Sequence, residues 1–305
     1  MDRLISPTCL AFDGSGRLYV ADSHWHNVFV LDQGERWNPV FTRTTAPDPQ
    51  MPELQEVRSM VAAPGGGLCI AETYGYRIWR WREPFQAEII AGNGEEGFTN
   101  DGEDILHGKI GAVPSITVDA SGLVIFFDAS RLLLRRLTGT GAAQTLGGNR
   151  RMEPTPDGLP IDRTALAEIT GLAFDARGRL VFCDRSLQAV RVVNELGVVV
   201  SLWEDPSVGA LRDPTQIVAD RAGQVFVLDG GNRRVLRVDT HREPVAVSCV
   251  FEAPAPADGE RALALGSIAI DAEGGLLGVD AGAARILKLH ADGSVTELPT
   301  AIRSA

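Results

Sequence analysis

The feature that most constrains the fold is an acidic residue that returns six times along the chain in the same local setting. Each acid ends a short apolar segment and precedes a polar turn. The six acids are Asp22, Glu72, Asp128, Asp184, Asp229 and Asp280. An aliphatic residue follows each acid by six positions, and no gap is needed inside any unit. Such regular spacing indicates an internal repeat.

A second turn precedes each acid. Five of the six units carry Asp nine residues before the acid and Gly three residues after that Asp. The pairs are Asp13 and Gly16, Asp119 and Gly122, Asp175 and Gly178, Asp220 and Gly223, and Asp271 and Gly274. The second unit instead has APGGG at residues 63–67, which also favours a tight turn. Asp and Gly at this spacing predict a hairpin between two strands.

Each unit has room for four strands. Apolar residues stand ten and twelve positions before the acid, the period of a strand with one packed face. The segment that ends at the acid is apolar almost throughout, as in LYVAD at residues 18–22, which predicts a strand covered on both faces. A third strand follows the turn, and a less regular fourth strand ends the unit. Successive acids lie 50, 56, 56, 45 and 51 residues apart, a period typical of propeller blades.

We therefore predict an all-β fold: one six-bladed β-propeller of four-stranded antiparallel blades, which fills residues 1–305 as a single domain. The blades are expected at residues 5–45, 55–92, 112–148, 168–204, 213–251 and 264–300. Blade six supplies its own fourth strand, so we expect the ring to close by packing of blade six against blade one. The acid in every blade is expected to belong to the scaffold and to accept hydrogen bonds from the backbone of the following turn.

Charge and cysteine content narrow the class of protein. The chain has 40 acidic and 29 basic residues, a net charge of −11, whereas a surface that binds phosphates needs Lys and Arg. We expect neither nucleic acid nor a membrane as partner, and we see no signal peptide and no membrane-spanning run. A soluble, acidic, cytoplasmic monomer is expected. The cysteines lack metal or C-x-x-C spacing, so we expect buried free thiols at Cys9, Cys69, Cys183 and Cys249.

One copy of the repeat, DPTQIVADRAGQVFVLDGGNRRVLRVD, carries Pro214, Asp220, Gly223, Asp229 and the segment 232–235 in a distinctive order. This order resembles the NHL repeat family, and the Gly-rich segment at residues 91–110 looks like the linker of many bacterial members. The resemblance covers nearly the whole chain and implies a six-bladed propeller. NHL-like relatives include interaction and RNA-binding platforms, a histidine–metal amidating lyase and, more distantly, calcium-dependent lactonases. One fold hosts many functions, so the resemblance assigns none.

A ligand site is expected at the upper mouth of the central channel, where the first strands begin. This is the face that should carry the turns after the second strands and the linkers between blades. The residues 14 and 13 positions before each acid should ring the mouth, and most are small, such as Thr170 and Thr215. Arg58 and Gln216 differ, because a guanidinium and an amide can hold a carboxylate or carbonyl. The alternative is that Arg58 pairs with a nearby acid and holds no ligand; the candidates are Glu53, Glu56 and Glu72.

The turn SHWHN at residues 23–27 is the second candidate on this face. His24 stands beside Trp25, and Trp25 with Tyr74 of the next blade could form an aromatic binding rim. The alternative is that both aromatic side chains cover blade edges. The two histidines of this turn, His24 and His26, do not complete a metal site of three or four ligands. The remaining histidines do not recur at matching channel positions; they are His107, His241 and His290.

Several acidic residues near the same face could together bind a cation through their carboxylates. They are Asp101, Glu103, Asp104, Asp157, Asp162, Glu168, Asp213 and Asp258. Asp–Gly pairs in linkers are also typical turn residues. We therefore predict no cofactor, with Ca²⁺ or Zn²⁺ in the central channel as the open alternative. The basic pairs 135–136 and 233–234 are expected to be solvated.

These features favour a binding or interaction module that takes a protein, peptide or small-molecule ligand on the top face, around the channel. The alternative is an enzyme of the propeller lyase, hydrolase or cyclase type, similar to the amidating lyase or the lactonases and with or without a metal. The chain shows no nucleophile elbow, Walker loop or dinucleotide fingerprint. The sequence therefore assigns no catalytic residue.

Overall fold

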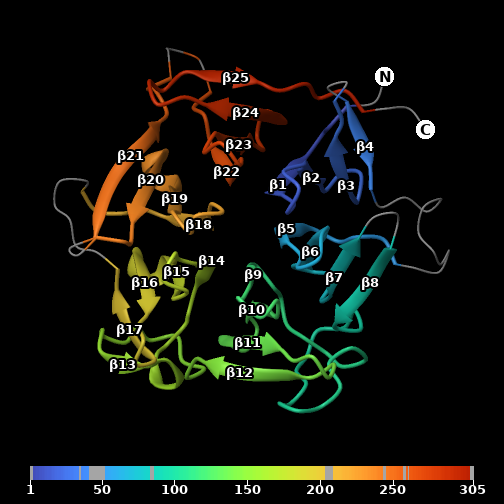
Figure 1. Ribbon diagram of the computed structural model, residues 1–305, viewed down its shortest axis with the longest axis vertical. Helices are drawn as coiled ribbons and strands as arrows, with labels where there is room; N and C mark the ends of the chain where they lie inside the picture. The colour runs from blue at the N-terminus through green and yellow to red at the C-terminus, as the bar shows by residue number, and fades with distance from the viewer. Residues whose placement is uncertain are drawn as a thin grey trace.

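A computed structural model describes residues 3–33, 36–40, 52–82, 86–202, 209–242, 245–256, 259 and 261–302. Six β-sheets stand in a ring around a central axis (Figure 1). Neighbouring strands in each sheet pair antiparallel. The six-bladed β-propeller predicted from the repeat is confirmed.

Blades one to three follow the chain from its N-terminal end. Blade one consists of β1 (Pro7–Phe12), β2 (Leu18–Asp22), β3 (Asn27–Leu31) and β4 (Trp37–Pro39). Blade two consists of β5 (Val57–Ala62), β6 (Leu68–Glu72), β7 (Ile78–Arg82) and β8 (Gln86–Ala91). Blade three consists of β9 (Ile116–Val118), β10 (Val124–Asp128), β11 (Leu133–Leu137) and β12 (Ala143–Gly147).

Blades four to six complete the ring. Blade four consists of β14 (Ile169–Phe174), β15 (Leu180–Asp184), β16 (Ala189–Val193) and β17 (Val198–Ser201), with a fifth short strand, β13 (Leu159–Pro160), on β17. Blade five consists of β18 (Pro214–Ala219), β19 (Val225–Asp229), β20 (Arg234–Asp239) and β21 (Ala246–Glu252). Blade six consists of β22 (Leu265–Ile270), β23 (Leu276–Asp280), β24 (Arg285–Leu289) and β25 (Val295–Glu297). Three short 3-10 helices are η1 (Ile161–Arg163), η2 (Arg185–Leu187) and η3 (Gly230–Asn232).

The apolar core lies between the blades. All five residues of the second strand are buried in each of the six blades, as their continuous apolar character predicted. Six hydrophobic clusters fill the spaces between neighbouring sheets. One of them joins Val279 of blade six to Val20 of blade one and so closes the ring. A blade therefore buries its faces only against its neighbours.

The hairpins between first and second strands follow the prediction. In each of the five Asp-containing units the carboxylate accepts backbone N–H groups two and four residues later, as Asp119 does from Ser121 and Leu123 at 2.9 Å. The Gly of each unit has a positive φ between 72° and 88°, which favours residues without a side chain.

The recurring acids are part of the scaffold. All six carboxylate residues are at most 2% exposed. Asp22 accepts N–H bonds from the following turn, at His24 and Trp25, and also from Ile5 and Ser6 in the segment before its first strand. Bonds from the segment before the first strand recur in blades two, three and five. The expected bond from a backbone N–H of the following turn is present in blades one, three and four, so Asp22 and Asp128 each tie a turn to the start of their own blade.

The ring closes where the first and last described segments of the chain meet, with Arg3 and Ala301 in an antiparallel bridge. After β25 the chain crosses to blade one, where Leu4 N–H donates to Thr300 O and Trp37 N–H to Ala301 O, each at 3.0 Å. The Trp37 indole N–H donates to Pro299 O at 2.8 Å. Closure thus combines the expected packing of two complete blades with a tail that the repeat did not predict.

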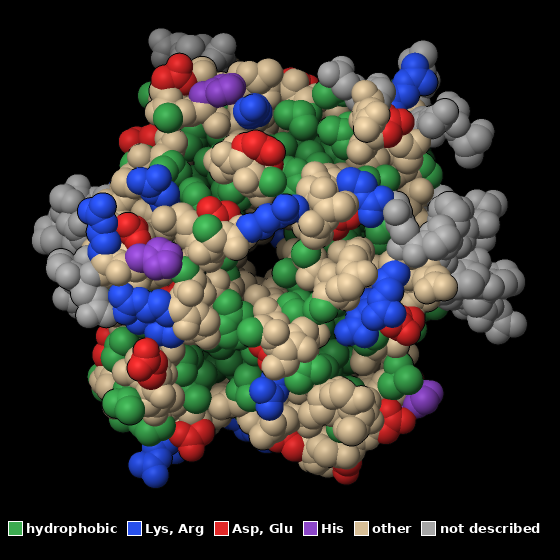
Figure 2. Space-filling view, in the orientation of Figure 1, with side chains coloured by type: hydrophobic (Ala, Val, Ile, Leu, Met, Phe, Trp, Pro, Cys, Tyr) green, Lys and Arg blue, Asp and Glu red, His purple; other side chains and the backbone are tan. Residues whose placement is uncertain are grey.

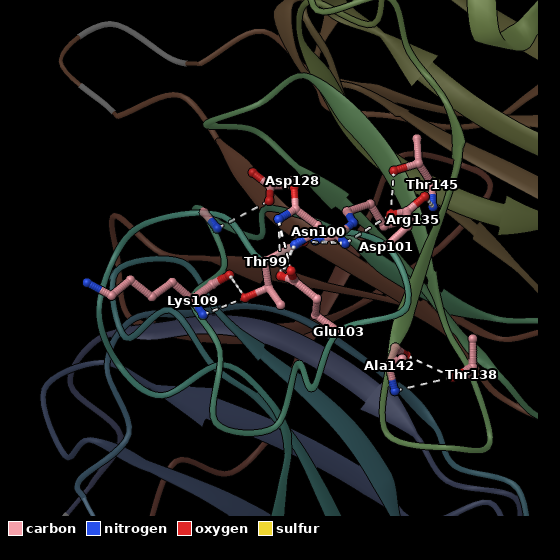
Figure 3. Close-up of polar contacts among 11 residues, drawn as sticks. Thr99, Asn100, Asp101, Glu103, Lys109, Asp128, Arg135, Thr138, Ala142 and Thr145 are labelled. Carbon is pink, nitrogen blue, oxygen red and sulfur yellow. Dashed lines mark hydrogen bonds and ion pairs between the residues drawn. The ribbon is translucent and has the colours of Figure 1, made fainter.

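Two linkers are clamped to the blades by buried arginines. Arg135 donates to Thr99 O at 2.7 Å and pairs with Asp101 at 3.2 Å, while Asp101 also accepts from Thr145 N (Figure 3). Arg191 forms the same clamp in blade four, with Asp157 at 3.0 Å, and Ser201 N donates to Asp157. The expectation that Arg135 is solvated is wrong, because the linker folds over it and leaves its side chain 0% exposed.

The cysteines follow the prediction in part. All four are free thiols, and three are buried, but Cys249 is exposed because it lies on the outermost strand, β21, of blade five. In the described part of the chain, no helix has the length and apolar character needed to cross a membrane.

Candidate functional site

The six innermost strands surround a central channel of about 690 Å³, as their position in the repeat predicted. The opening is visible at the centre of the ring in Figure 2. Five of the seven predicted ligand-binding residues line this channel: Arg58, Tyr74, Thr170, Thr215 and Gln216. The volume is typical of small-molecule sites in proteins.

A β-bulge positions the mouth residues. In five blades the pairing of the first strand with the second skips one residue, 14 positions before the recurring acid. In blade two, Val57 pairs with Glu72 and Ser59 with Ala71, so Arg58 between them is left out of the ladder. Bulges redirect side chains, which is how a strand residue comes to face the channel mouth. The skipped residues are Thr8, Arg58, Thr170, Thr215 and Gly266.

Several mouth residues join neighbouring blades. Thr170 Oγ1 donates to Pro214 O of the next blade at 2.7 Å, and Thr8 makes the equivalent bond to Val57 O at 2.8 Å. One position later, Gln216 Oε1 accepts Ile268 N–H at 2.5 Å. In the same way, Ser59 Oγ and Ser267 Oγ each accept a backbone N–H of the next blade. The oxygen of Gln216 is therefore used by the scaffold, while no residue in the described ranges pairs with its Nε2.

Arg58 pairs with Glu56, one of the three acids considered from the sequence. Arg58 Nε donates to Glu56 Oε1 at 2.5 Å, and Nη2 contacts the same oxygen. The Arg58 side chain is nevertheless 59% exposed, against 26% for Glu56. An exposed ion pair contributes little to stability, so this pair leaves Arg58 available to a ligand at low cost.

A second guanidinium at the mouth was not predicted. Arg185 of blade four pairs with Asp213 at 2.5 Å and lies 3.6 Å from Glu168. It directly follows the recurring acid, where the other five blades have Ser, Thr, Ala or Gly. That difference is the signal by which the sequence could have revealed it. Glu56 was considered only as a competitor for Arg58, although it also lines the channel.

Two hydroxyl groups at the mouth lack partners. The Oγ1 atoms of Thr73 and Thr215 are buried, and neither forms a hydrogen bond with any described residue. Both residues line the channel, and Tyr74 beside Thr73 is 62% exposed. A buried hydroxyl without a partner costs free energy, which a bound polar group can recover.

The remaining two predicted residues lie apart from the channel. His24 packs edge-on against Trp25, with ring centroids 5.0 Å apart. The Trp25 indole N–H donates to Arg3 O at 3.0 Å, and neither residue lines the channel. Trp25 therefore lies outside the channel lining to which Tyr74 belongs, and the aromatic rim stays a prediction.

The described residues include no cluster of three or more His, Cys, Asp or Glu side chains suited to a metal ion. His26 Nδ1 is bound to Leu54 O at 2.9 Å. Among the linker acids, Asp101 and Asp157 serve the arginine clamps and each precedes a glycine of positive φ, as expected for turn residues. Asp258 lies outside the described residues.

Near the mouth, burial favours the uncharged forms of the Cys9 thiol and the Glu72 carboxyl. Burial raises the pKa of the Cys9 thiol to about 11, so it remains protonated at neutral pH. Burial also raises the pKa of the Glu72 carboxyl to about 6, although hydrogen bonds from Trp79 and Gln55 oppose the shift. The accessible chemistry at the mouth consists of paired guanidinium and carboxylate groups, hydroxyls and an amide.

No protein-family model and no curated protein matches this chain. Similar solved structures include virginiamycin B lyase from Staphylococcus aureus, with 14% identity and a TM-score of 0.60 over 100% of this chain and 87% of that chain. A gluconolactonase from Xanthomonas campestris, XC5397, has 12% identity and a TM-score of 0.60 over 91% and 84%. A chain of a nidogen–laminin complex has 12% identity and a TM-score of 0.60 over 98% and 92%.

At this level of identity the similarities show the propeller fold and nothing about activity. The similar structures are named as lyases, a lactonase and a binding complex, so they span both classes of function considered from the sequence. The finer resemblance to NHL repeats stays a prediction that rests on the residues of the repeat.

Proposed function

We propose that this protein is an NHL-type binding module that holds a small molecule or a peptide end at the upper mouth of its central channel. The observation that carries the proposal is the channel itself, because its volume of about 690 Å³ combines with converging polar groups from several blades. The exposed side chains of Arg58 and Tyr74 supply the contacts, with the free Nε2 of Gln216. Thr170 and Thr215 contribute to the wall of the same mouth.

The net charge of −11 argues against nucleic acid and anionic membranes as partners. We propose a cytoplasmic monomer that binds its ligand without a metal. Trp25 and His24 belong to the proposed top face as contacts for a larger ligand, such as a peptide that extends beyond the mouth.

An enzyme of the lyase or lactonase type is the second candidate, and the names of the similar solved structures favour it. Metal analysis of protein purified without chelators separates the two. One equivalent of Ca²⁺ or Zn²⁺ that stays bound through purification would favour the enzyme and contradict the metal-free module.

A plug in the mouth tests the proposed site. Gly266 lines the channel, and a Cβ built there meets only the Ala281 Cβ, at 3.8 Å, so Gly266→Trp can fill the mouth without backbone strain. We expect the variant to abolish ligand-detected NMR signals that the wild type gives with a set of small carboxylates, amides and short peptides.

Gly139→Trp is the matched control, because a Cβ there meets nothing within 4 Å and the residue does not line the channel. It should bind as the wild type does. Wild-type signals that survive in Gly266→Trp would place the ligand elsewhere and overturn the proposed site.

A further inference from the structure

Below its polar mouth, the channel has an apolar wall. Every blade contributes an aliphatic or aromatic residue from its innermost strand: Phe12, Met60, Val118, Phe174, Val218 and Ile270. Five of these six are partly exposed although they belong to the hydrophobic clusters between blades. Apolar surface that faces a cavity favours an apolar occupant.

At the mouth above this wall, Arg58 pairs with one acid among the residues that the structure describes. Both Nε and Nη2 of Arg58 contact one oxygen of Glu56, and Arg58 is more exposed than Glu56. Arg185 has two acidic partners, Asp213 and Glu168, so it is the less available of the two guanidinium groups. A ligand carboxylate can therefore take the place of Glu56 on Arg58 at little cost, because the broken ion pair is exposed to solvent.

We infer that the channel takes an apolar carboxylic acid, whose carboxylate binds Arg58 and whose hydrocarbon part enters the channel. The inference rests on the proposed function, since it names the ligand class of the same site. Glu56 is then a competitor that occupies Arg58 when no acid is bound. Two parallel N–H···O bonds from a guanidinium to a carboxylate give both affinity and orientation.

Removal of the competitor should strengthen binding, and removal of the cation should weaken it. The probes are octanoate, octan-1-ol and octylammonium, which share one hydrocarbon chain and differ in the charge of the head group. Binding is measured by isothermal titration calorimetry at pH 7. We expect Glu56→Gln to increase the octanoate affinity about threefold to tenfold and Arg58→Gln to decrease it about tenfold or more.

Two controls isolate the site. Octan-1-ol should bind more weakly than octanoate, with the same affinity in the wild type and both variants, because it carries no charge. Glu88→Gln removes an acid paired with Arg80 at 3.8 Å on the outermost strand of blade two, so it changes the net charge equally and should leave octanoate binding unchanged. Gly266→Trp should abolish the octanoate signal.

The possible outcomes distinguish this inference from the proposed function. Equal affinity for octanoate and octan-1-ol, with no effect of Glu56→Gln, would overturn the acid and leave the channel as an apolar ligand site. Preference for octylammonium would show that Glu56 is the binding group. If none of the three probes binds, the inference of an apolar ligand is overturned. The proposed site at the mouth would still be supported by any ligand of the NMR set that binds the wild type and does not bind Gly266→Trp.

Discussion

Glu72 stands where the other five blades have Asp, and its longer side chain brings the carboxylate to 2.8 Å from the indole nitrogen of Trp79. The residue is fully buried, and its nearest cation, Arg77, lies 3.9 Å away. Burial disfavours the charged form more than these partners stabilise it, which raises the carboxyl pKa to about 6.

The raised pKa predicts a pH dependence of stability. The folded state holds the proton more tightly than the unfolded state, so the free energy of unfolding falls as pH rises from about 4.5 to above 6, by about 2 kcal/mol. We expect the stability of Glu72→Gln relative to the wild type to increase by this amount between pH 4 and pH 7.5, measured by urea denaturation. Glu88→Gln should show no such trend, and a constant difference for Glu72→Gln would contradict the prediction.

Substitutions at the two neighbouring arginines of blade three should destabilise the fold by different amounts. Arg135 is buried, stacks on Phe98 at 4.7 Å and pairs with Asp101, so Arg135→Met breaks a buried pair and should cost about 3 kcal/mol of unfolding free energy. Arg136→Met is the control and should cost about 1 kcal/mol or less, because Arg136 is partly exposed and lies 3.9 Å from Asp119. Equal losses in urea denaturation would show that the clamp does not stabilise the linker.

At the scale of elements, the innermost strands approach each other closely around the channel. Side chains at the mouth bridge this space in five blades, for example Ser59, whose Oγ accepts Ile116 N–H at 3.1 Å. Gly171 occupies the position of Ser59 in blade four, and there the neighbouring backbone leaves no room for a side chain: a Cβ would lie 2.6 Å from Ile217 N.

This close approach predicts that Gly171→Ala destabilises the fold by about 2 kcal/mol, because the two strands must move apart. Gly266→Ala is the matched change in blade six, where the nearest atom is 3.8 Å away, and should stay within about 0.5 kcal/mol of the wild type. Thermal denaturation followed by circular dichroism measures both. A neutral Gly171→Ala would mean that the blades can separate at no cost.

At the scale of the whole molecule, stability depends on closing the ring, because each blade is covered only by its neighbours. The segment 299–302 provides three hydrogen bonds to blade one, and Ile302 packs into the cluster between blades six and one. The interface between blades six and one thus has additional contacts from segment 299–302. At the other five interfaces the continuous chain already connects the two neighbouring blades.

A chain that ends at Leu298 should therefore lose roughly 4 kcal/mol of unfolding free energy, from three hydrogen bonds and one buried side chain. A chain that ends at Ile302 keeps all of these contacts and should match the wild type. Urea denaturation of the two variants gives the comparison. Equal stability would show that blade packing alone closes the ring.

The sequence by itself determined the repeat and hence the six blades, the buried second strands and the Asp–Gly hairpins, because these depend on local periodicity and turn geometry. It also predicted that the residue 14 positions before each recurring acid lines the channel, since that distance is constant along the chain, whereas His24 and Trp25 do not line it. Only the tertiary structure singled out Glu56 among the three candidate partners of Arg58 and placed a second guanidinium, Arg185, at that mouth. It alone also showed the burial of Arg135 beneath a linker and the tail that joins blade six to blade one. These features depend on contacts between segments far apart in the chain, and residue periodicity carries no information about such distances.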